Sequence, residues 1–206
     1  MLHNLPAGDW AGGERGIACH PERVPEFEAG VDLAIDYATA LGCRQLNCLA
    51  GRLPDDVDAA DARATFIRNL GYAASRLEKT GITLLIEAIN TRDVPGFFLN
   101  GTAQAVDIAR ACGPITPFVQ FDAYHMHRMA EDIVAMLRRH LSHIRHIQIA
   151  DDPGRHEPGT GSIDFPALFA ALDGAGYTGA IGCEYNPGGI TEDGLGWARP
   201  FLKERR

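Results

Sequence analysis

Short apolar runs alternate with longer amphipathic segments along the whole chain, a pattern typical of strands that are each followed by a helix. The strands that this pattern predicts are Gln45–Leu49, Thr83–Glu87, Phe118–Asp122, Ile144–Ile149 and Ala180–Glu184. The predicted helices are Glu26–Leu41, Ala60–Thr80, Thr102–Cys112, Ala130–Leu141, Phe165–Ala175 and Thr191–Leu202. Strict alternation of strand and helix predicts a parallel sheet with right-handed crossovers.

The spacing of the strands favours a (β/α)₈ barrel over a doubly wound sheet. The strands begin at residues 45, 83, 118, 144 and 180, so they recur every 26 to 38 residues. A (β/α)₈ barrel of about 250 residues uses about 31 residues per unit. A doubly wound sheet usually carries a glycine-rich phosphate turn after its first strand. The nearest run, Gly159-Thr160-Gly161, follows a late strand and lacks the third glycine. We therefore predict an α/β fold, the (β/α)₈ TIM barrel.

The number of strands is smaller than a full barrel requires. Five complete strands are predicted, and Met1–Leu5 reads as the end of a sixth that leads directly into a loop. Two βα units are therefore expected to be missing before Met1, which corresponds to about 60 residues or more. No linker, internal repeat or low-complexity segment is visible. We expect residues 1–206 to form one domain, an N-terminally incomplete barrel.

Polar residues stand at the carboxyl ends of four predicted strands, at Glu87, Asp122, Gln148 and Glu184. Barrel enzymes build their active sites at this face. One polar strand end could mean only that the strand reaches solvent, but three carboxylates that converge would repel one another. A cation removes that repulsion, and an all-oxygen ligand set suits Mg²⁺ or Mn²⁺ better than structural zinc.

Two further residues are candidates for substrate binding. His125 lies three residues after Asp122 and could donate a hydrogen bond to a substrate or polarise a carbonyl group; alternatively, it is a loop histidine with a backbone partner. Arg155 follows the Ile144–Ile149 strand and could bind a carboxylate through two hydrogen bonds. The alternative is a surface arginine that pairs with Asp151 or Asp152.

Composition removes several classes of function. A net charge of −8 disfavours nucleic acid and anionic membrane surfaces as partners. No apolar run approaches the roughly 18 residues that span a bilayer, and no signal peptide is apparent. Five cysteines without a CxxC spacing predict reduced thiols and a cytoplasmic location. Lys79 and Lys203 are the only lysines among 19 basic residues, which argues against Schiff-base or pyridoxal phosphate chemistry.

Six stretches of the sequence resemble the hydroxypyruvate isomerases, a branch of the xylose-isomerase-like barrels. They are Leu2–Trp10 (LHNLPAGDW), Gly13–Cys19 (GERGIAC), Ile86–Asn90 (IEAIN), Tyr124–Met129 (YHMHRM), Glu157–Gly161 (EPGTG) and Gly182–Tyr185 (GCEY). The resemblance extends from Met1 to about Trp197. The 2-oxotetronate isomerases share the site residues but are less similar in the first loop.

The resemblance implies roles for the residues already singled out. The metal ligands would be Glu87, Asp122, Gln148 and Glu184, and the catalytic pair would be Glu87 and Glu184. The implied reaction converts hydroxypyruvate to tartronate semialdehyde by metal-assisted proton transfer through an enediolate. The cofactor would be one Mg²⁺ or Mn²⁺ ion, with Arg155 anchoring the substrate carboxylate.

The sequence departs from this family in two ways, and other functions stay open. The first strands are absent, and Asn186 stands where a lysine is common. A 2-oxotetronate isomerase or a sugar epimerase would use the same site. A phosphodiesterase resembling the AP endonucleases would need more metal-binding histidines and a basic groove. An inactive barrel fragment would expose apolar edges. We expect a small hydroxy-carbonyl acid as the partner, no nucleic acid or membrane, and allow for a homo-oligomer.

Overall fold

The computed structural model describes residues 2–201 and contains one parallel sheet of six strands. The strands are β1 (Leu2–Asn4), β2 (Gln45–Cys48), β3 (Thr83–Glu87), β4 (Phe118–Asp122), β5 (Ile144–Ile149) and β6 (Ile181–Cys183). Each strand pairs in parallel with its neighbour in the sequence, so the order is β1-β2-β3-β4-β5-β6. A doubly wound sheet reverses its strand order partway. The unbroken order is that of a barrel wall, as predicted.

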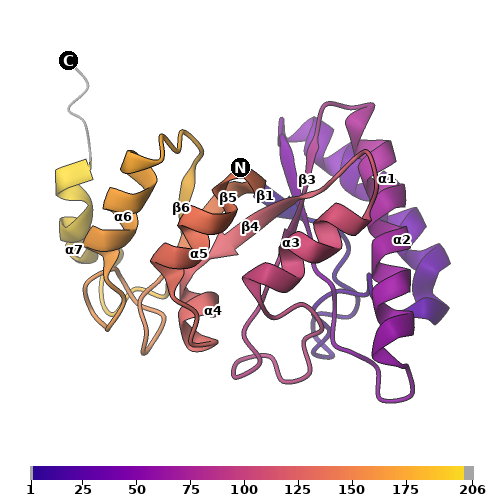
Figure 1. The fold of residues 1–206 in the computed structure, drawn as a ribbon, viewed down its shortest axis with the longest axis horizontal. Helices are drawn as coiled ribbons and strands as arrows, with labels where there is room; N and C mark the ends of the chain where they lie inside the picture. The colour runs from indigo at the N-terminus through magenta and orange to yellow at the C-terminus, as the bar shows by residue number, and fades with distance from the viewer. Residues whose placement is uncertain (1, 202–206) are drawn as a thin grey trace.

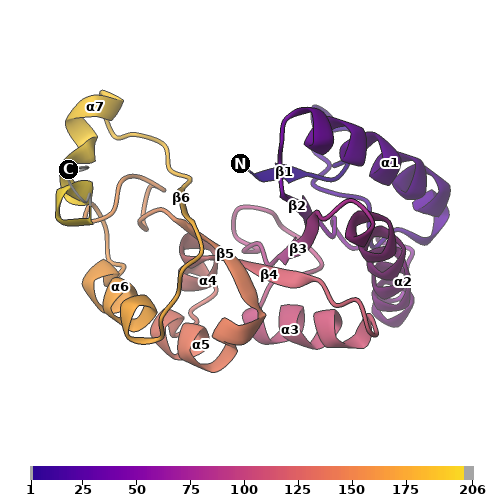
Figure 2. The ribbon, with the colours of Figure 1, turned by 90° about the horizontal axis from the view of Figure 1, so that it is seen from above.

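Helices cover the outer side of this sheet. They are α1 (Val24–Ala40), α2 (Ala59–Glu78), α3 (Thr102–Ala111), α4 (Ala123–Arg128), α5 (Ile133–His140), α6 (Phe165–Gly174) and α7 (Thr191–Gly194). Short 3₁₀ helices span Pro21–Arg23, Leu141–His143 and Leu195–Phe201. Figure 2 shows the strands along an arc, with α1, α2, α3, α5 and α6 outside it and β1 and β6 at its two ends. The sheet is thus an incomplete barrel, open between β1 and β6.

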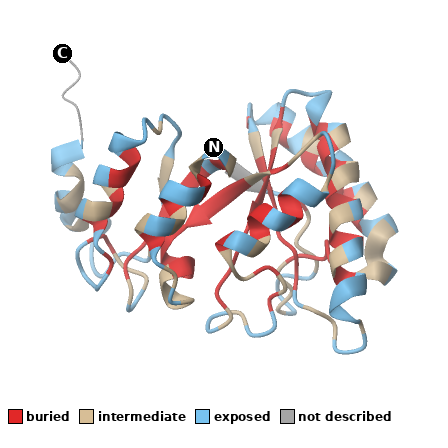
Figure 3. Cartoon of the chain, in the orientation of Figure 1, coloured by how far each residue is buried: buried red, intermediate tan, exposed pale blue. Residues whose placement is uncertain are grey.

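The apolar core lies between the sheet and the outer helices. Phe27 of α1 and Phe66 of α2 are almost fully buried, as are Leu46 of β2, Ile86 of β3 and Phe121 of β4. Figure 3 shows the buried colour on the strands and on the inner faces of these helices, and the exposed colour on their outer faces. Each such side chain contributes about 1.5–3 kcal/mol through its removal from water. The core therefore fixes the strand positions, and with them the polar strand ends.

Two helices differ from the expectation. The helix predicted to begin at Ala130 begins at Ile133, because the Asp132 side chain caps it by accepting a hydrogen bond from the Ala135 amide. The last helix is shorter: α7 ends at Gly194, and a 3₁₀ helix with Pro200 inside it follows. Residue 202, the predicted end of that helix, lies outside the described residues.

One short helix was not predicted at all. Helix α4 starts immediately after Asp122 and lies at the lower edge of the sheet in Figure 1. The Asp122 side chain caps it by accepting hydrogen bonds from the amides of Tyr124 and His125. The tight connection from strand to helix brings His125 back over the strand end.

Two features of the structure concern the cysteines and the apolar character of the helices. None of the five cysteines, all within the described residues, forms a disulfide bond: Cys19, Cys43 and Cys48 are buried, Cys112 is half-buried and Cys183 is exposed. Within residues 2–201, no helix has both the length and the apolar character needed to cross a bilayer.

Candidate metal centre and active site

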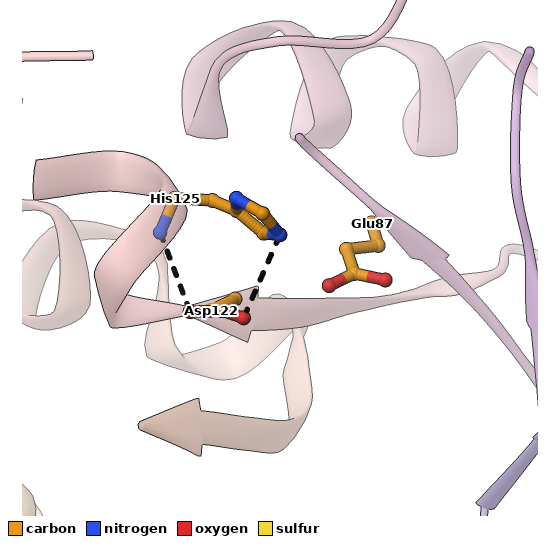
Figure 4. Close-up of side chains that lie close together, drawn as sticks. All are labelled: Glu87, Asp122 and His125. Carbon is orange, nitrogen blue, oxygen red and sulfur yellow. Dashed lines mark hydrogen bonds and ion pairs between the residues drawn. The ribbon is translucent and has the colours of Figure 1, made fainter. Parts of the chain in front are cut away.

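Three buried side chains meet at the carboxyl edge of the sheet. Glu87 ends β3, Asp122 ends β4, and His125 lies in the first turn of α4 (Figure 4). One potential ligand atom of each lies within 4.8 Å of the others. Their exposed fractions are only 5%, 1% and 4%. Two acidic groups are therefore held close together away from water, which is costly unless a positive charge joins them.

The two oxygens of Asp122 have different surroundings. Oδ1 accepts the capping hydrogen bonds from the amide nitrogens of Tyr124 at 2.8 Å and His125 at 3.3 Å. Oδ2 is buried and has no hydrogen-bond partner in the described part of the chain. The nearest basic nitrogens are Nε2 of His125 at 3.8 Å and Nη2 of Arg155 at 3.7 Å, both beyond hydrogen-bond range. An unpartnered carboxylate oxygen in this position fits a bound cation.

Glu87 is a buried acid with a strongly raised pKa. Its Oε2 accepts a hydrogen bond of 2.7 Å from Nδ2 of Asn47, which comes from β2. Burial raises the pKa of Glu87 to about 8, and the negative charges of Asp122 and Glu184 act in the same direction. A divalent cation beside these groups would reverse that effect by stabilising the ionised form. The carboxyl groups therefore fit a hard cation with oxygen ligands.

Gln148 and Glu184 lie at the same edge but outside this compact group. Gln148 is buried beside Asp122 in the β4–β5 register, and its Oε1 accepts a hydrogen bond from Nε2 of Gln120. The side chain of Glu184 is 53% exposed, and its Oε2 lies 2.7 Å from Nη2 of Arg155. Burial and the charge of Asp122 raise the pKa of Glu184, whereas Arg155 lowers it.

All four predicted ligands therefore share one edge of the sheet. The tightest group of acids and histidines, however, contains His125, a predicted substrate-binding residue, and not Glu184. Burial lowers the pKa of His125, an effect that the nearby Asp122 opposes.

Arg155 lies beside the acidic strand ends and not in an ion pair with Asp151 or Asp152. Its backbone adopts a left-handed conformation with φ of +56°, which is uncommon for a side chain of this size. The guanidinium group lies between Glu184 and Asp122, with its central carbon 5.1 Å from the centre of the Tyr124 ring. Backbone strain of this kind is concentrated at functional sites.

The two aspartates that offered the alternative partner for Arg155 are engaged elsewhere. Asp151 is fully buried and accepts hydrogen bonds from four backbone amides, those of Asp152, Gly159, Gly161 and Ile163. Asp152 pairs with Arg128, whose Nη1 lies 2.8 Å from its Oδ1. Asp151 therefore folds the loop that carries Arg155, and Arg155 is left for the site.

Two residues of the site were missed by the sequence analysis. Asn47 donates a hydrogen bond to Glu87, and Nδ2 of Asn90 lies 2.7 Å from Nδ1 of His125. Strand alternation could have found Asn47, since it lies inside a predicted strand. Asn90 belongs to the irregular segment after β3, where no periodicity marks which side chains turn inward. Its position in the IEAIN stretch was the only available signal.

Comparison with known proteins agrees with this geometry. Residues 1–201 match the family described as the xylose isomerase-like TIM barrel. The chain is 48% identical to hydroxypyruvate isomerase of Escherichia coli K12, over 97% of this chain and 78% of that protein. It is 44% identical to 2-oxo-tetronate isomerase of Cupriavidus necator, over 98% of this chain and 77% of that protein.

A solved structure shows the same likeness. The crystal structure of AP endonuclease, family 2, from Brucella melitensis superposes with a TM-score of 0.94 and 42% identity. The match covers 98% of this chain and 78% of that one. The chain described here belongs to the xylose isomerase-like TIM barrel family.

Proposed function

We propose that this protein is an isomerase that interconverts hydroxypyruvate and tartronate semialdehyde by moving a proton between neighbouring carbons. The observation that carries the proposal is the group of carboxyl side chains, Glu87, Asp122 and Glu184, at the ends of three strands of this barrel wall. The 48% identity to a protein named hydroxypyruvate isomerase supports the choice of substrate.

The residues proposed to hold a divalent cation are Glu87, Asp122, Gln148 and Glu184. The partnerless Oδ2 of Asp122 and the raised pKa of Glu87 support this set. The cation, Mg²⁺ or Mn²⁺ by the hardness of the oxygen ligands, would stabilise negative charge that develops on the substrate oxygens.

Glu87 and Glu184 are the proposed proton carriers. One carboxylate removes a proton from the hydroxyl-bearing carbon, which leaves an enediolate. The hydroxyl proton passes to the former carbonyl oxygen, and the other carboxyl group delivers a proton to the neighbouring carbon. The two groups differ in environment, since Glu87 is buried and Glu184 is half exposed. Different environments allow two carboxyl groups to hold their protons at different pH, as acid–base pairs require.

Arg155 and His125 are proposed to bind the substrate. The planar guanidinium of Arg155 can make two parallel hydrogen bonds to the carboxylate of a small acid. Nε2 of His125 faces Asp122 and is placed to reach a substrate oxygen (Figure 4). Both groups orient the substrate relative to the two glutamates, which lowers the entropic barrier of the proton transfer.

Proton NMR of hydroxypyruvate in D₂O tests the proposal. We expect tartronate semialdehyde, with deuterium incorporated at carbon, in the presence of Mg²⁺ or Mn²⁺ and none with EDTA. The Glu184→Gln variant, if folded, should lose turnover. Turnover by the EDTA-treated protein, or full activity of Glu184→Gln, would contradict the assigned roles. Parallel trials with a 2-oxotetronate and with ketosugars separate the related isomerase and epimerase activities, because the 2-oxo-tetronate isomerase is 44% identical.

A second candidate function is the cleavage of abasic DNA, which the name of the Brucella melitensis structure favours. The net charge of −8 counts against it, as does the single group of three or more clustered acid, histidine or cysteine ligands among the described residues. A nicking assay on plasmid DNA that contains abasic sites distinguishes the two functions. Metal-dependent nicking without isomerase activity would replace the first proposal.

We also propose a cytoplasmic setting, without nucleic-acid or membrane partners, on the basis of the acidic composition and of described cysteines that form no disulfide bond. Association with a second copy of the chain stays a prediction, to be measured by light scattering.

A further inference from the structure

We propose that Asn90 is a positioning residue that fixes His125 as its Nε2–H tautomer. In this form His125 donates a hydrogen bond into the site and cannot serve as a ligand of the cation. The role of that hydrogen bond toward substrate rests on the proposed function, whereas the tautomer and the exclusion of His125 from the ligand set do not.

The orientation of the Asn90 amide is set by its backbone neighbours. Asn90 is fully buried, and its Oδ1 accepts hydrogen bonds from the amide nitrogens of Asp93 at 2.8 Å and Arg92 at 3.1 Å. An amide NH₂ group has no capacity to accept these bonds, so the oxygen and nitrogen ends cannot be exchanged. Nδ2 must therefore be the end that faces the histidine.

The Nδ2 group has two hydrogens and two neighbours. One neighbour is Oδ2 of Asp93 at 3.0 Å, and the other is Nδ1 of His125 at 2.7 Å. Since Nδ2 can only donate, Nδ1 of His125 must accept and carries no hydrogen. A neutral imidazole then carries its hydrogen on Nε2. The other tautomer and the imidazolium ion would each place an N–H group against an N–H group.

Asp93 is held in place so that it can receive the second hydrogen. Its Oδ2 accepts a hydrogen bond of 2.8 Å from the Tyr124 hydroxyl, and its Oδ1 lies 3.4 Å from Nη2 of Arg128. Donors therefore surround Asp93, which keeps it an acceptor for Asn90. These contacts, which run from Tyr124 through Asp93 and Asn90 to His125, therefore fix which group donates in each hydrogen bond.

The consequence concerns the nitrogen that faces the site. Nε2 of His125 points toward Asp122 and Glu87 in Figure 4, at 3.8 Å from Oδ2 of Asp122. A histidine that binds a metal uses the lone pair of one nitrogen and donates the hydrogen of the other to an acceptor. Here Nδ1 of His125 faces the Nδ2 donor of Asn90 and accepts its hydrogen. The hydrogen of the imidazole is therefore on Nε2, which has no lone pair to offer a metal. The proximity of Glu87, Asp122 and His125 does not make a three-residue metal site, and the ligands that remain are oxygens.

The matched variant is Asn90→Asp, which has the same shape. One carboxylate oxygen still accepts the two backbone hydrogen bonds, and the other can accept from the histidine. Because this second oxygen would lie against Oδ2 of Asp93, Asn90→Asp is combined with Asp93→Asn in every test, which replaces one of the two facing acceptors with an amide donor, and Asp93→Asn alone is the control. His125 should then carry its hydrogen on Nδ1 and direct the Nε2 lone pair into the site. Imidazole ligands favour Zn²⁺ and Co²⁺ over Mg²⁺, so the change should also shift metal preference.

Nitrogen NMR of the histidine side chains tests the tautomer directly. Metal-free, ¹⁵N-labelled protein is compared with Asn90→Asp, combined with Asp93→Asn, above the pH at which imidazole is neutral, with the His125 signals identified by their loss in His125→Asn. We expect the Nε2–H pattern in the wild type and the Nδ1–H pattern in the variant. The Nδ1–H pattern in the wild type would overturn the proposal, and this measurement stands even where Asn90→Asp does not fold.

Metal binding gives a second readout that is independent of turnover. The ratio of Zn²⁺ or Co²⁺ affinity to Mg²⁺ affinity, measured by calorimetry, should rise by about tenfold or more in Asn90→Asp. Addition of His125→Asn to this variant should remove that gain. An unchanged ratio would overturn the exclusion of His125 from the ligand set. If the proposed function holds, Asn90→Asp also lowers kcat/KM for hydroxypyruvate; failure of that function alone leaves both the NMR and the affinity results unaffected.

Discussion

Nη2 of Arg155 lies 2.7 Å from Oε2 of Glu184 and links the loop after β5 to the end of β6. The pair joins a proposed substrate-binding group to a proposed proton carrier. A guanidinium group has five N–H donors, and one contact with Glu184 leaves several of them for a planar acid. Arg155 can therefore hold a substrate carboxylate and Glu184 at the same time, and the position of one constrains the other.

Replacement of Arg155 should weaken substrate binding more than it slows turnover. The loss of hydrogen bonds to a charged group costs about 1.5–3 kcal/mol. Arg155→Ala should therefore lower kcat/KM for hydroxypyruvate about 10- to 100-fold, mainly through KM. Arg155→Lys should recover only part of the loss, because an ammonium group cannot form the two parallel bonds. Steady-state kinetics of the two variants check this, and an unchanged KM in Arg155→Ala would remove the residue from the substrate site.

The raised pKa of buried Glu87 should make the metal-free protein less stable as pH rises. An unfolded glutamate releases its proton near 4.5, whereas folded Glu87 keeps its proton up to about 8. Between these values the folded state binds more protons, so the free energy of unfolding falls with rising pH, by up to about 1.4 kcal/mol per pH unit. Glu87→Gln keeps an acceptor for Asn47 and has no proton to lose. Its stability should therefore depend less on pH across this window.

Urea unfolding in EDTA at several pH values gives the comparison. Glu184→Gln serves as the control, since the side chain of Glu184 is 53% exposed and solvent screens its charge. We expect Glu184→Gln to change the pH dependence of the free energy of unfolding less than Glu87→Gln does. Equal slopes for the wild type and Glu87→Gln would show that Glu87 is ionised in the folded protein throughout.

A divalent cation should stabilise the wild type but not Asp122→Asn. An asparagine keeps the Oδ1 acceptor that caps α4 through the Tyr124 amide, so the fold of this segment is retained. It removes the charge at Oδ2, which has no other partner among the described residues. At a cation concentration of 100 times its Kd, we expect about 2.7 kcal/mol of stabilisation in the wild type. Thermal unfolding with and without Mg²⁺ or Mn²⁺ measures it, and equal shifts in both proteins would place the cation elsewhere.

The strands and the polar strand ends were predictable because local pattern and global fold agree there. The predicted strands are apolar runs that follow one another at a spacing of about one barrel unit. The polar residue that ends a strand, such as Glu87 or Asp122, lies where the sheet meets the loops. Parallel register then fixes which ends are neighbours, as for Asp122 and Gln148. No side-chain detail was needed for these inferences.

The partners of those residues were not predictable in the same way. Whether Arg155 faces Glu184 or a surface aspartate depends on a left-handed backbone residue and on the fold of its loop, neither of which leaves a periodic signal. Helix α4 has only six residues and exists because Asp122 caps it, so its length gave no amphipathic pattern. The contact between Asn90 and His125 joins two such irregular segments.

The loop that carries Arg155 should depend on the buried carboxylate of Asp151. Its Oδ2 accepts hydrogen bonds of 2.8 Å from the amides of Gly159 and Gly161, and its Oδ1 accepts two more. Asp151→Asn leaves an NH₂ group facing at least one pair of these donors. A fully buried donor without a partner costs about 1–3 kcal/mol, and most of these donors are only partly buried, so each should cost an amount in the lower part of that range. For a pair of donors we expect a loss of roughly 2–4 kcal/mol in the free energy of unfolding. Because the loop that carries Arg155 would be less well ordered, Asp151→Asn should also raise KM, as Arg155→Ala does.

Ser162→Ala is the matched control for Asp151→Asn, because Ser162 lies in the same loop and its hydroxyl makes an exposed hydrogen bond of 2.9 Å to the Asp152 carbonyl. We expect a change of about 0.5–1 kcal/mol or less from this control and an unchanged KM. Urea unfolding and steady-state kinetics on both variants separate the two effects. A large loss of stability in Asp151→Asn with an unchanged KM would mean that the loop conformation does not determine the position of Arg155. The position of Arg155 would then depend on its contact with Glu184 alone.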